Sequence, residues 1–491
     1  ALVICPASLR EMWRAELREA AIPAEILSQE MLGREACDTR PYHDSDVILI
    51  DESHNFRNHV TNRYDSLQRL IAGNGGRGRD GERKKVILLT ATPINNTIFD
   101  LYNQIMLFAQ GDRTTFSAAG IGDLRRFFLD ARRRADGEIA ALFNLLEEVV
   151  VRRTRPFIRQ AYPQATIRGE PIRWPERRLR TVRYDLEQTY AGIYDHVVAG
   201  IESLQLAPYN LETYKQTGLA RDEWELGRQQ ALVGIFKSRY LKRFESSVAA
   251  FRISMRRALE FLKTFEALLD EGRLLDSASF WKAMRYLERE GEEDDAVPHA
   301  QAEPLSEREE AREILEELAA LDPAQYNLDH LHAALQHDVG VLTEIWDRIK
   351  GITPERDAKL RRIKDLLADE LRGEKVLIFT YYKDTARYLH QQLREDDDFL
   401  AAAGGPRMAR MDSGVAPRDR GRWIARFAPV ANERPELAGR EEEIDLMIST
   451  DVLSEGQNLQ DCGLLLNYDL HWNPTRMVQR AGRIDRIGSP F

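Results

Sequence analysis

The chain has little cysteine and no long apolar run. Only three of its 491 residues are cysteines, at positions 5, 37 and 462. An odd number of widely spaced cysteines excludes a disulfide framework and a CxxC zinc site, and it suits a reducing cytoplasm. No apolar run approaches the ~18 residues of a membrane span, and the apolar stretch at the N-terminus is too short for a secretory signal. We therefore expect a cytoplasmic, globular protein with no membrane partner.

The chain also lacks the positive net charge that is common in nucleic-acid-binding proteins. It has 70 Lys and Arg against 80 Asp and Glu, which gives a net charge of −10. The distribution changes the conclusion, because residues 286–320 contain thirteen acidic and three basic residues and so carry the whole of that charge. Residues 151–180 contain nine arginines and two acidic residues, with aromatic residues between them. Such a segment suits a groove that follows a phosphate backbone, or a linker whose arginines pair with acidic neighbours.

A third absence concerns phosphate binding. The GxxxxGK[ST] loop that cradles nucleotide phosphates is missing, because the chain contains no Gly-Lys dipeptide. Residues 73–81 (GNGGRGRDG) are rich in glycine, but no predicted strand precedes them and no Lys-Ser/Thr pair follows. We predict a loop there rather than a phosphate-binding turn.

Short apolar runs alternate with helical patterns at both ends of the chain, as in parallel sheets that are buried on both faces. These runs lie at residues 2–5, 47–50, 86–90, 376–380, 409–412, 444–449 and 463–468. The residues between the two groups have long helical periodicity, and 232–269 indicate one or two long amphipathic helices. The predicted fold class is α/β, with two parallel-sheet lobes and a large helical insertion. The predicted domains are lobe one at 1–160, a basic linker at 161–184, the helical insertion at 185–354 with its acidic segment at 286–320, and lobe two at 355–491.

Polar residues directly follow two of the N-terminal runs. Asp51 and Glu52 come after the run 47–50, and residues 90–92 follow the next predicted strand. The carboxyl ends of parallel strands form the edge at which ligands bind in open α/β sheets. An acidic pair there suits nucleoside triphosphate hydrolysis, in which one carboxylate holds Mg²⁺ through water and another activates the attacking water. By itself, such a pair is more often a strand end with solvated charges.

Arginines recur near the C-terminus at the spacing of helix neighbours. Gln479, Arg480, Arg483 and Arg486 form the pattern QRxGRxxR, which predicts that they share one helix face. An arginine supplied to a γ-phosphate neutralises developing charge, with an effect on the order of 10³–10⁵ in rate. A solvated basic face is the usual interpretation of an arbitrary RxxR pair, but the complete pattern favours contact with a triphosphate.

The motifs also form an ordered set. They are PASL…W, DESH, LLTATPINN, VRRTR, VLIFTYYKDTARYL, STDVLSEGQNLQ, DLHWNP and QRAGRIDRIG. This set resembles the Swi/Snf group of superfamily two helicase-type ATPases, in its bacterial RapA-like branch. The resemblance covers residues 1–488, more loosely in the helical middle. It implies two RecA-like lobes that use ATP and Mg²⁺ and act on double-stranded DNA.

The resemblance implies a role for each matching residue. It places catalysis on Asp51, Glu52, Arg483 and Arg486, with Asp51 holding Mg²⁺ through water. Nucleotide contacts fall on Gln479, Glu455 and Gly456, together with Asp51 and the two arginines. The elements that couple the ATP and DNA sites are His54, Thr90 and Thr92. The implied DNA-binding residues are Pro6, Ala7, Ser8, Thr380, Tyr381, Ser449, Thr450, Asn458 and Trp472.

We predict an ATP-dependent double-stranded DNA translocase that remodels protein–DNA complexes in the bacterial nucleoid. Its partners would be RNA polymerase or other DNA-bound proteins, in transcription recycling or in defence against foreign DNA. Because the family's P-loop segment is missing, we expect these 491 residues to be a fragment that is inactive alone. The alternative is an ATP-independent scaffold on degenerate helicase lobes, which only holds nucleic acid or polymerase. A P-loop sequence upstream of Ala1 would favour the motor over the scaffold.

Overall fold

The computed structural model divides the chain into two compact units. The first unit comprises Ala1–Arg173 and Asn473–Val478, and the second comprises Trp174–Trp472 and Gln479–Phe491. The structure describes every residue except 35–36, 95–96, 134–144, 148, 153, 168–169, 173, 220, 276–319, 454–456, 472, 487–488 and 490–491. All but the last residue of the acidic segment 286–320 therefore lies outside the described residues, as do Glu455, Gly456 and Trp472 of the predicted sites.

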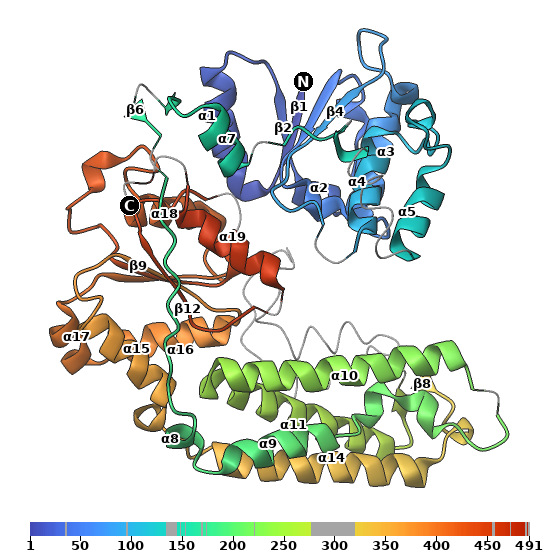
Figure 1. Ribbon diagram of the computed structural model, residues 1–491. Helices are drawn as coiled ribbons and strands as arrows, with labels where there is room; N and C mark the ends of the chain where they lie inside the picture. Colours follow the sequence, from blue (N-terminus) through green and yellow to red (C-terminus); the bar gives the residue numbers. More distant parts are fainter. Residues whose placement is uncertain are drawn as a thin grey trace. The chain divides into compact units, whose positions relative to one another are not determined.

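The first unit is built on a four-stranded parallel sheet (Figure 1). Its strands are β1 (Leu2–Cys5), β2 (Glu25–Ser28), β3 (Val47–Ile50) and β4 (Lys85–Leu88), in the order β2-β1-β3-β4. Its helices are α1 (Arg10–Glu19), α2 (Gln29–Leu32), α3 (Asn62–Ala72), α4 (Phe99–Phe108), α5 (Leu124–Arg133) and α7 (Arg155–Ala161). Two short strands, β5 (Thr166–Ile167) and β6 (Glu170–Pro171), pair antiparallel outside this sheet.

Helices cover this sheet on both sides of β1. Successive residues of a strand point to opposite faces, so Leu2 and Ile4 of β1 pack in one cluster with side chains of α3. Val3 and Cys5 pack in another cluster with side chains of α1. Because neither side of β1 meets water, every residue of this strand is buried, and the strand is a continuous apolar run in the sequence.

The second unit contains another four-stranded parallel sheet. Its strands are β9 (Val376–Phe379), β10 (Met408–Met411), β11 (Leu446–Ser449) and β12 (Leu464–Asn467), in the order β10-β11-β9-β12. The helices that follow or connect them are α15 (Ala358–Ala368), α16 (Lys383–Arg394), α17 (Asp397–Ala403), α18 (Pro417–Phe427) and α19 (Pro474–Ile484), of which the part from Gln479 onward belongs to this unit. Val376 and Ile378 pack with α15 and α16, whereas Leu377 and Phe379 pack with α18. This sheet is therefore also buried on both faces.

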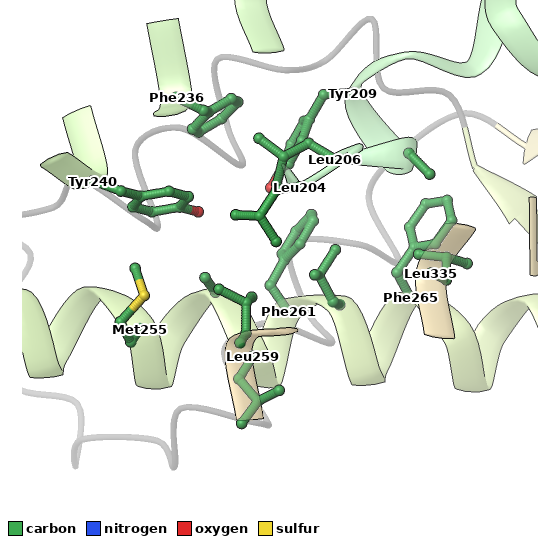
Figure 2. Close-up of a cluster of buried hydrophobic side chains, with 14 of the residues drawn as sticks. Leu204, Leu206, Tyr209, Phe236, Tyr240, Met255, Leu259, Phe261, Phe265 and Leu335 are labelled. Atoms are coloured by element: carbon green, nitrogen blue, oxygen red, sulfur yellow. The ribbon is translucent and has the colours of Figure 1, made fainter. Parts of the chain in front are cut away.

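The same unit contains a bundle of long helices. Its members are α8 (Glu187–Tyr190), α9 (Ile193–Ser203), α10 (Glu223–Ser246), α11 (Val248–Asp270) and α14 (Leu328–Ile349), with a short antiparallel pair β7 (Leu274–Leu275) and β8 (Ala320–Leu321). Figure 2 shows the core of the bundle, where Phe236 of α10 and Phe261 of α11 lie beside Tyr209. The Tyr209 ring stacks on Phe261 with 5.6 Å between ring centroids. Aromatic packing thus joins segments that are distant in the sequence.

Ser247 separates the two longest helices. Its backbone is extended, with φ −157° and ψ 152°, so α10 ends at the preceding residue. Its hydroxyl then accepts the N–H of Ala250 at 3.1 Å and caps the start of α11. Residues 232–269 therefore belong to two helices, one of the two outcomes that their pattern allowed.

The two parallel sheets and the helical bundle confirm the α/β fold class. The strand predictions differ in detail. β2 is absent from them, because its sequence EILS has too few apolar residues to resemble a buried strand. β4 begins and ends earlier than the predicted run 86–90. Among the helices that the structure describes, none combines the length and the apolar composition that crossing a bilayer requires.

We expect Phe261→Ala to destabilise the helical bundle. The Phe261 side chain is 2% exposed, and truncating a buried phenylalanine to alanine costs about 3–5 kcal/mol. Trp224→Ala, on α10, is the matched control because Trp224 is 75% exposed. Urea denaturation followed by circular dichroism measures both variants. Equal midpoints for the two variants would contradict the assigned core.

Candidate nucleotide and nucleic-acid sites

The first candidate site lies where β3 ends. The Asp51 N–H donates to the carbonyl of Ile4 in β1 at 2.9 Å, so the residue still belongs to the edge of the sheet. Glu52 then takes a left-handed backbone conformation, with φ 46°, which only a few per cent of non-glycine residues adopt. This turn ends the strand and starts the short 3₁₀ helix Ser53–Phe56. The acidic pair is thus held at the carboxyl edge of the sheet by the main chain.

Three neighbours hold Asp51. The indole N–H of Trp13 donates to its Oδ2 and the N–H of Glu52 donates to its Oδ1, each at 2.9 Å. The amide of Gln29 donates to its carbonyl oxygen at 2.6 Å. Burial raises the pKa of the Asp51 carboxyl, because desolvation disfavours the charged form. A cation nearby would offset that cost.

The residues at this edge fit one mode of magnesium binding. Within the described part of the chain, no group of three or more His, Cys, Asp and Glu side chains could hold a metal ion. Mg²⁺ in nucleotide sites commonly keeps its waters and binds one or two carboxylates plus the phosphates of the substrate. Asp51 meets that requirement, since each of its oxygens accepts a single N–H and retains another lone pair.

His54 connects the acidic pair to the end of β4. Its side chain is almost fully buried. Its Nδ1 lies 3.4 Å from the Glu52 carboxylate and 3.2 Å from the Thr90 hydroxyl. The same hydroxyl accepts the N–H of Thr92 at 3.1 Å. The structure therefore joins the three predicted coupling residues by hydrogen bonds and places the Glu52 carboxylate beside His54.

The predicted DNA-contacting residues of the first unit follow β1. Pro6 is partly exposed, and Ala7 and Ser8 are exposed. The N–H of Ala7 donates to both carboxylate oxygens of Glu30, at 3.0 and 3.1 Å. A phosphate that bound this N–H would have to displace Glu30, so an acidic side chain already occupies one position suited to an anion.

In the second unit, several predicted DNA-contacting side chains turn inward. Thr380 and Ser449 are fully buried and Thr450 is nearly so. The Thr380 hydroxyl donates to Asp469 at 2.6 Å, and the Ser449 hydroxyl donates to the carbonyl of Thr450 at 2.7 Å. Tyr381 is partly exposed, as is Asn458, so these two side chains reach solvent.

The arginines of α19 divide into different roles. Arg480 is fully buried, and its guanidinium forms two bonds to the Asp451 carboxylate, at 2.6 and 3.1 Å. Its side chain is therefore part of the protein interior. Arg483 donates to the carbonyl of Gln479 at 3.2 Å, one turn back along the helix. Arg486 lies beyond the last residue of α19, where it donates to the side chain of Asn458.

The basic segment also divides into two parts. In its second half, Arg177 forms an ion pair with Asp485 and Arg180 forms one with Glu370. In its first half, the rings of Phe157 and Tyr162 meet edge-to-face at 6.2 Å and are 44% and 57% exposed. The ion pairs favour the linker interpretation for the second half of the segment.

Sequence reasoning missed four residues that support these sites. They are Trp13, Gln29, Asp451 and Asp469. Asp451 and Asp469 lie within two residues of the ends of strands β11 and β12, which is the signal that singled out Asp51. Trp13 and Gln29 carried no such signal, because their contacts to Asp51 come from distant parts of the sequence.

Comparisons with known proteins agree with the resemblance to helicase-like proteins. Residues 358–488 match the family described as Helicase conserved C-terminal domain. The chain is 22% identical over 506 aligned residues to YqhH of Bacillus subtilis, named an uncharacterized ATP-dependent helicase, with 99% of this chain and 64% of YqhH aligned. It is 34% identical over 132 residues to the RNA polymerase-associated protein RapA of Sodalis glossinidius, covering 27% of this chain and 12% of RapA.

Among solved structures, the chain aligns with the SWI2/SNF2 ATPase core of Sulfolobus solfataricus in complex with dsDNA. That alignment covers 99% of this chain and 74% of the other at 15% identity, with a TM-score of 0.27. The chain thus spans less than two thirds of the length of YqhH and a small part of RapA.

We expect Arg480→Met to destabilise the second unit. The change keeps the length of the side chain but leaves Asp451 without its cationic partner, and breaking a buried pair in this way costs about 3–5 kcal/mol. Arg434→Met is the control, because Arg434 and Glu436 form an exposed pair of the kind that contributes at most about 1 kcal/mol. Differential scanning calorimetry would contradict the assignment if both variants melted together.

Proposed function

We propose that this chain, a helicase-like protein of the Swi/Snf family, forms the core of an ATP-dependent motor that moves along double-stranded DNA. One observation carries the proposal. Asp51 and Glu52 stand at the carboxyl edge of a parallel sheet, and Glu52 shares the buried His54 with Thr90 at the end of the neighbouring strand. If the acidic pair were only a solvated strand end, contacts from Glu52 through His54 to Thr90 would not be expected.

We assign activation of the attacking water to Glu52. Its carboxylate lies beside His54, so a change in its charge alters the electrostatic environment of the imidazole. His54 in turn contacts the Thr90 hydroxyl, which also holds the N–H of Thr92. The state of the nucleotide site would thereby reach residues 90–92. Mg²⁺, held through water by Asp51, would supply neutralisation of phosphate charge.

We assign neutralisation of the γ-phosphate to Arg483 and Arg486. Arg480 is excluded from this role, because its guanidinium is buried against Asp451. The assignment of Arg483 and Arg486 rests on the spacing QRxGRxxR and on the family resemblance. Each of them donates through Nε to a carbonyl one turn earlier, Gln479 for Arg483 and Gly482 for Arg486.

The proposed substrate track is the DNA backbone. Ala7 and Ser8 in the first unit and Tyr381 and Asn458 in the second are at least partly exposed. Contacts of main-chain N–H groups and small polar side chains with phosphates carry no sequence information. We therefore propose a motor that binds duplex DNA of any sequence and displaces bound proteins, RNA polymerase among them, in the bacterial nucleoid.

We expect Glu52→Gln to abolish DNA-stimulated ATP hydrolysis in the natural full-length protein. Loss of a general base reduces turnover by about 10²–10⁴-fold, whereas the amide preserves the shape of the side chain. Glu82→Gln is the control, since Glu82 is an exposed residue of the loop before β4. Coupled-enzyme ATPase assays with and without duplex DNA measure the effect. Unchanged turnover in Glu52→Gln would reject the catalytic assignment.

We expect binding to duplex DNA to weaken steeply with salt and to be equal for unrelated sequences. Each neutralised phosphate contributes about −0.9 to the slope of log K against log salt concentration. Fluorescence anisotropy with two unrelated duplexes at several salt concentrations gives the slope. A marked preference for one duplex would contradict backbone recognition. Salt-sensitive binding without any ATPase activity in the full-length protein would support the scaffold instead of the motor.

A further inference from the structure

A line of buried hydroxyl groups joins the helical bundle to the sheet of the second unit. Ser246 is the last residue of α10, and its hydroxyl lies 2.6 Å from Oδ2 of Asp469 and 2.8 Å from the hydroxyl of Thr385. The hydroxyl of Ser247 lies 2.8 Å from the same Thr385 oxygen. Ser246 and Thr385 are fully buried and Ser247 nearly so, so these groups cannot exchange their partners for water.

The direction of these hydrogen bonds follows from the carboxylate at one end. An ionised carboxylate only accepts, whereas a hydroxyl donates one proton. The proton of Ser246 therefore goes to Asp469, and Ser246 can only accept from Thr385. The Thr385 proton is then used, so Thr385 accepts from Ser247. The four groups form a single line with one donor and one acceptor at each hydroxyl.

The carboxylate at the end of this line also holds a predicted DNA-contacting segment. Asp469 accepts the Thr380 hydroxyl at 2.6 Å and the N–H of Tyr381 at 2.7 Å. Its two oxygens therefore bind one donor from the bundle and two from the segment that follows β9. The Tyr381 ring, partly exposed, lies against His471 at 4.9 Å between ring centroids. The position of Tyr381 thus depends on the position of Asp469.

Charged groups keep the end of α10 in place. Arg243, one turn earlier, forms an ion pair with Asp384 at 2.9 Å, with side chains 5% and 2% exposed. The ammonium of Lys359 donates to the last carbonyls of α10, those of Glu245 and Ser246, each at 2.9 Å. These contacts fix the end of α10, so the Ser246 hydroxyl has a defined position. We therefore infer that Ser246 orients the Asp469 carboxylate, and not the reverse.

We propose that Ser246 is a positioning residue, through which the helical bundle sets the DNA contact made by Tyr381. The proposal rests on the proposed function, because it assumes that Tyr381 touches DNA. Without the Ser246 hydroxyl, Asp469 loses one of its three donors and the N–H of Tyr381 loses its fixed acceptor. The bundle would then no longer determine where Tyr381 lies.

The test compares Ser246→Ala with Ser238→Ala, an exposed serine on the same helix. We expect Ser246→Ala to weaken binding of a fluorescent duplex by about tenfold or more, the effect of one lost hydrogen bond to a charged group. Ser238→Ala should bind like the wild type. In ATPase assays of the full-length protein, the DNA concentration at half-maximal stimulation should rise while turnover at saturating DNA stays unchanged.

A double-mutant cycle with Tyr381→Ala separates positioning from general destabilisation. If Ser246 acts through Tyr381, Ser246→Ala should cause no further loss of affinity in the Tyr381→Ala background. Additive losses would overturn the proposal, as would equal affinities of Ser246→Ala and Ser238→Ala. If Ser246→Ala does not fold, Thr385→Val takes its place in the same cycle, since it removes the hydroxyl that donates to Ser246. A wild-type chain that binds no duplex would overturn the proposed function and this inference together.

Discussion

The hydrogen bonds to the Asp469 carboxylate are the contacts on which the second unit depends. They join the end of α10, the segment after β9 and the segment after β12 at one point. Hydrogen bonds to a charged group contribute about 1.5–3 kcal/mol each, and a partly buried carboxylate that loses a donor retains the cost of its desolvation. An arrangement of the three segments that removed one of these donors would therefore be less stable.

The carboxylates at the strand ends have different partners in the two units. In the second unit, Asp451 is neutralised by the guanidinium of Arg480, and this pair fixes α19 against the sheet. In the first unit, Asp51 is held by the N–H groups of Trp13 and Glu52, and its pKa is raised by burial. The Asp451–Arg480 pair is complete within the fold. The Asp51 carboxylate, by contrast, would be further stabilised by a cation, as expected of a nucleotide site.

The pattern QRxGRxxR shows which features of a site residue spacing predicts and which it does not. Its spacing predicted a helix that carries these residues, and α19 covers Gln479 to Ile484. The spacing could not tell which arginine pairs with a carboxylate in the interior, because that depends on where Asp451 and the Phe379 ring lie in space. Nor could it show that Arg486 lies beyond the helix and contacts Asn458. The side chains at one helical spacing thus have three different environments.

The sequence by itself determined the fold class, the order of the motifs and the positions of most strands, because strands that are buried on both faces must be continuously apolar. It also showed that residues 286–320 account for the net negative charge of the chain. Only the tertiary structure decided which polar residues are inside. Thr380 and Arg480 are buried because carboxylates from distant parts of the chain, Asp469 and Asp451, accept their hydrogen bonds. Such contacts depend on how helices and strands pack against one another, and this packing cannot be predicted from local periodicity or residue spacing.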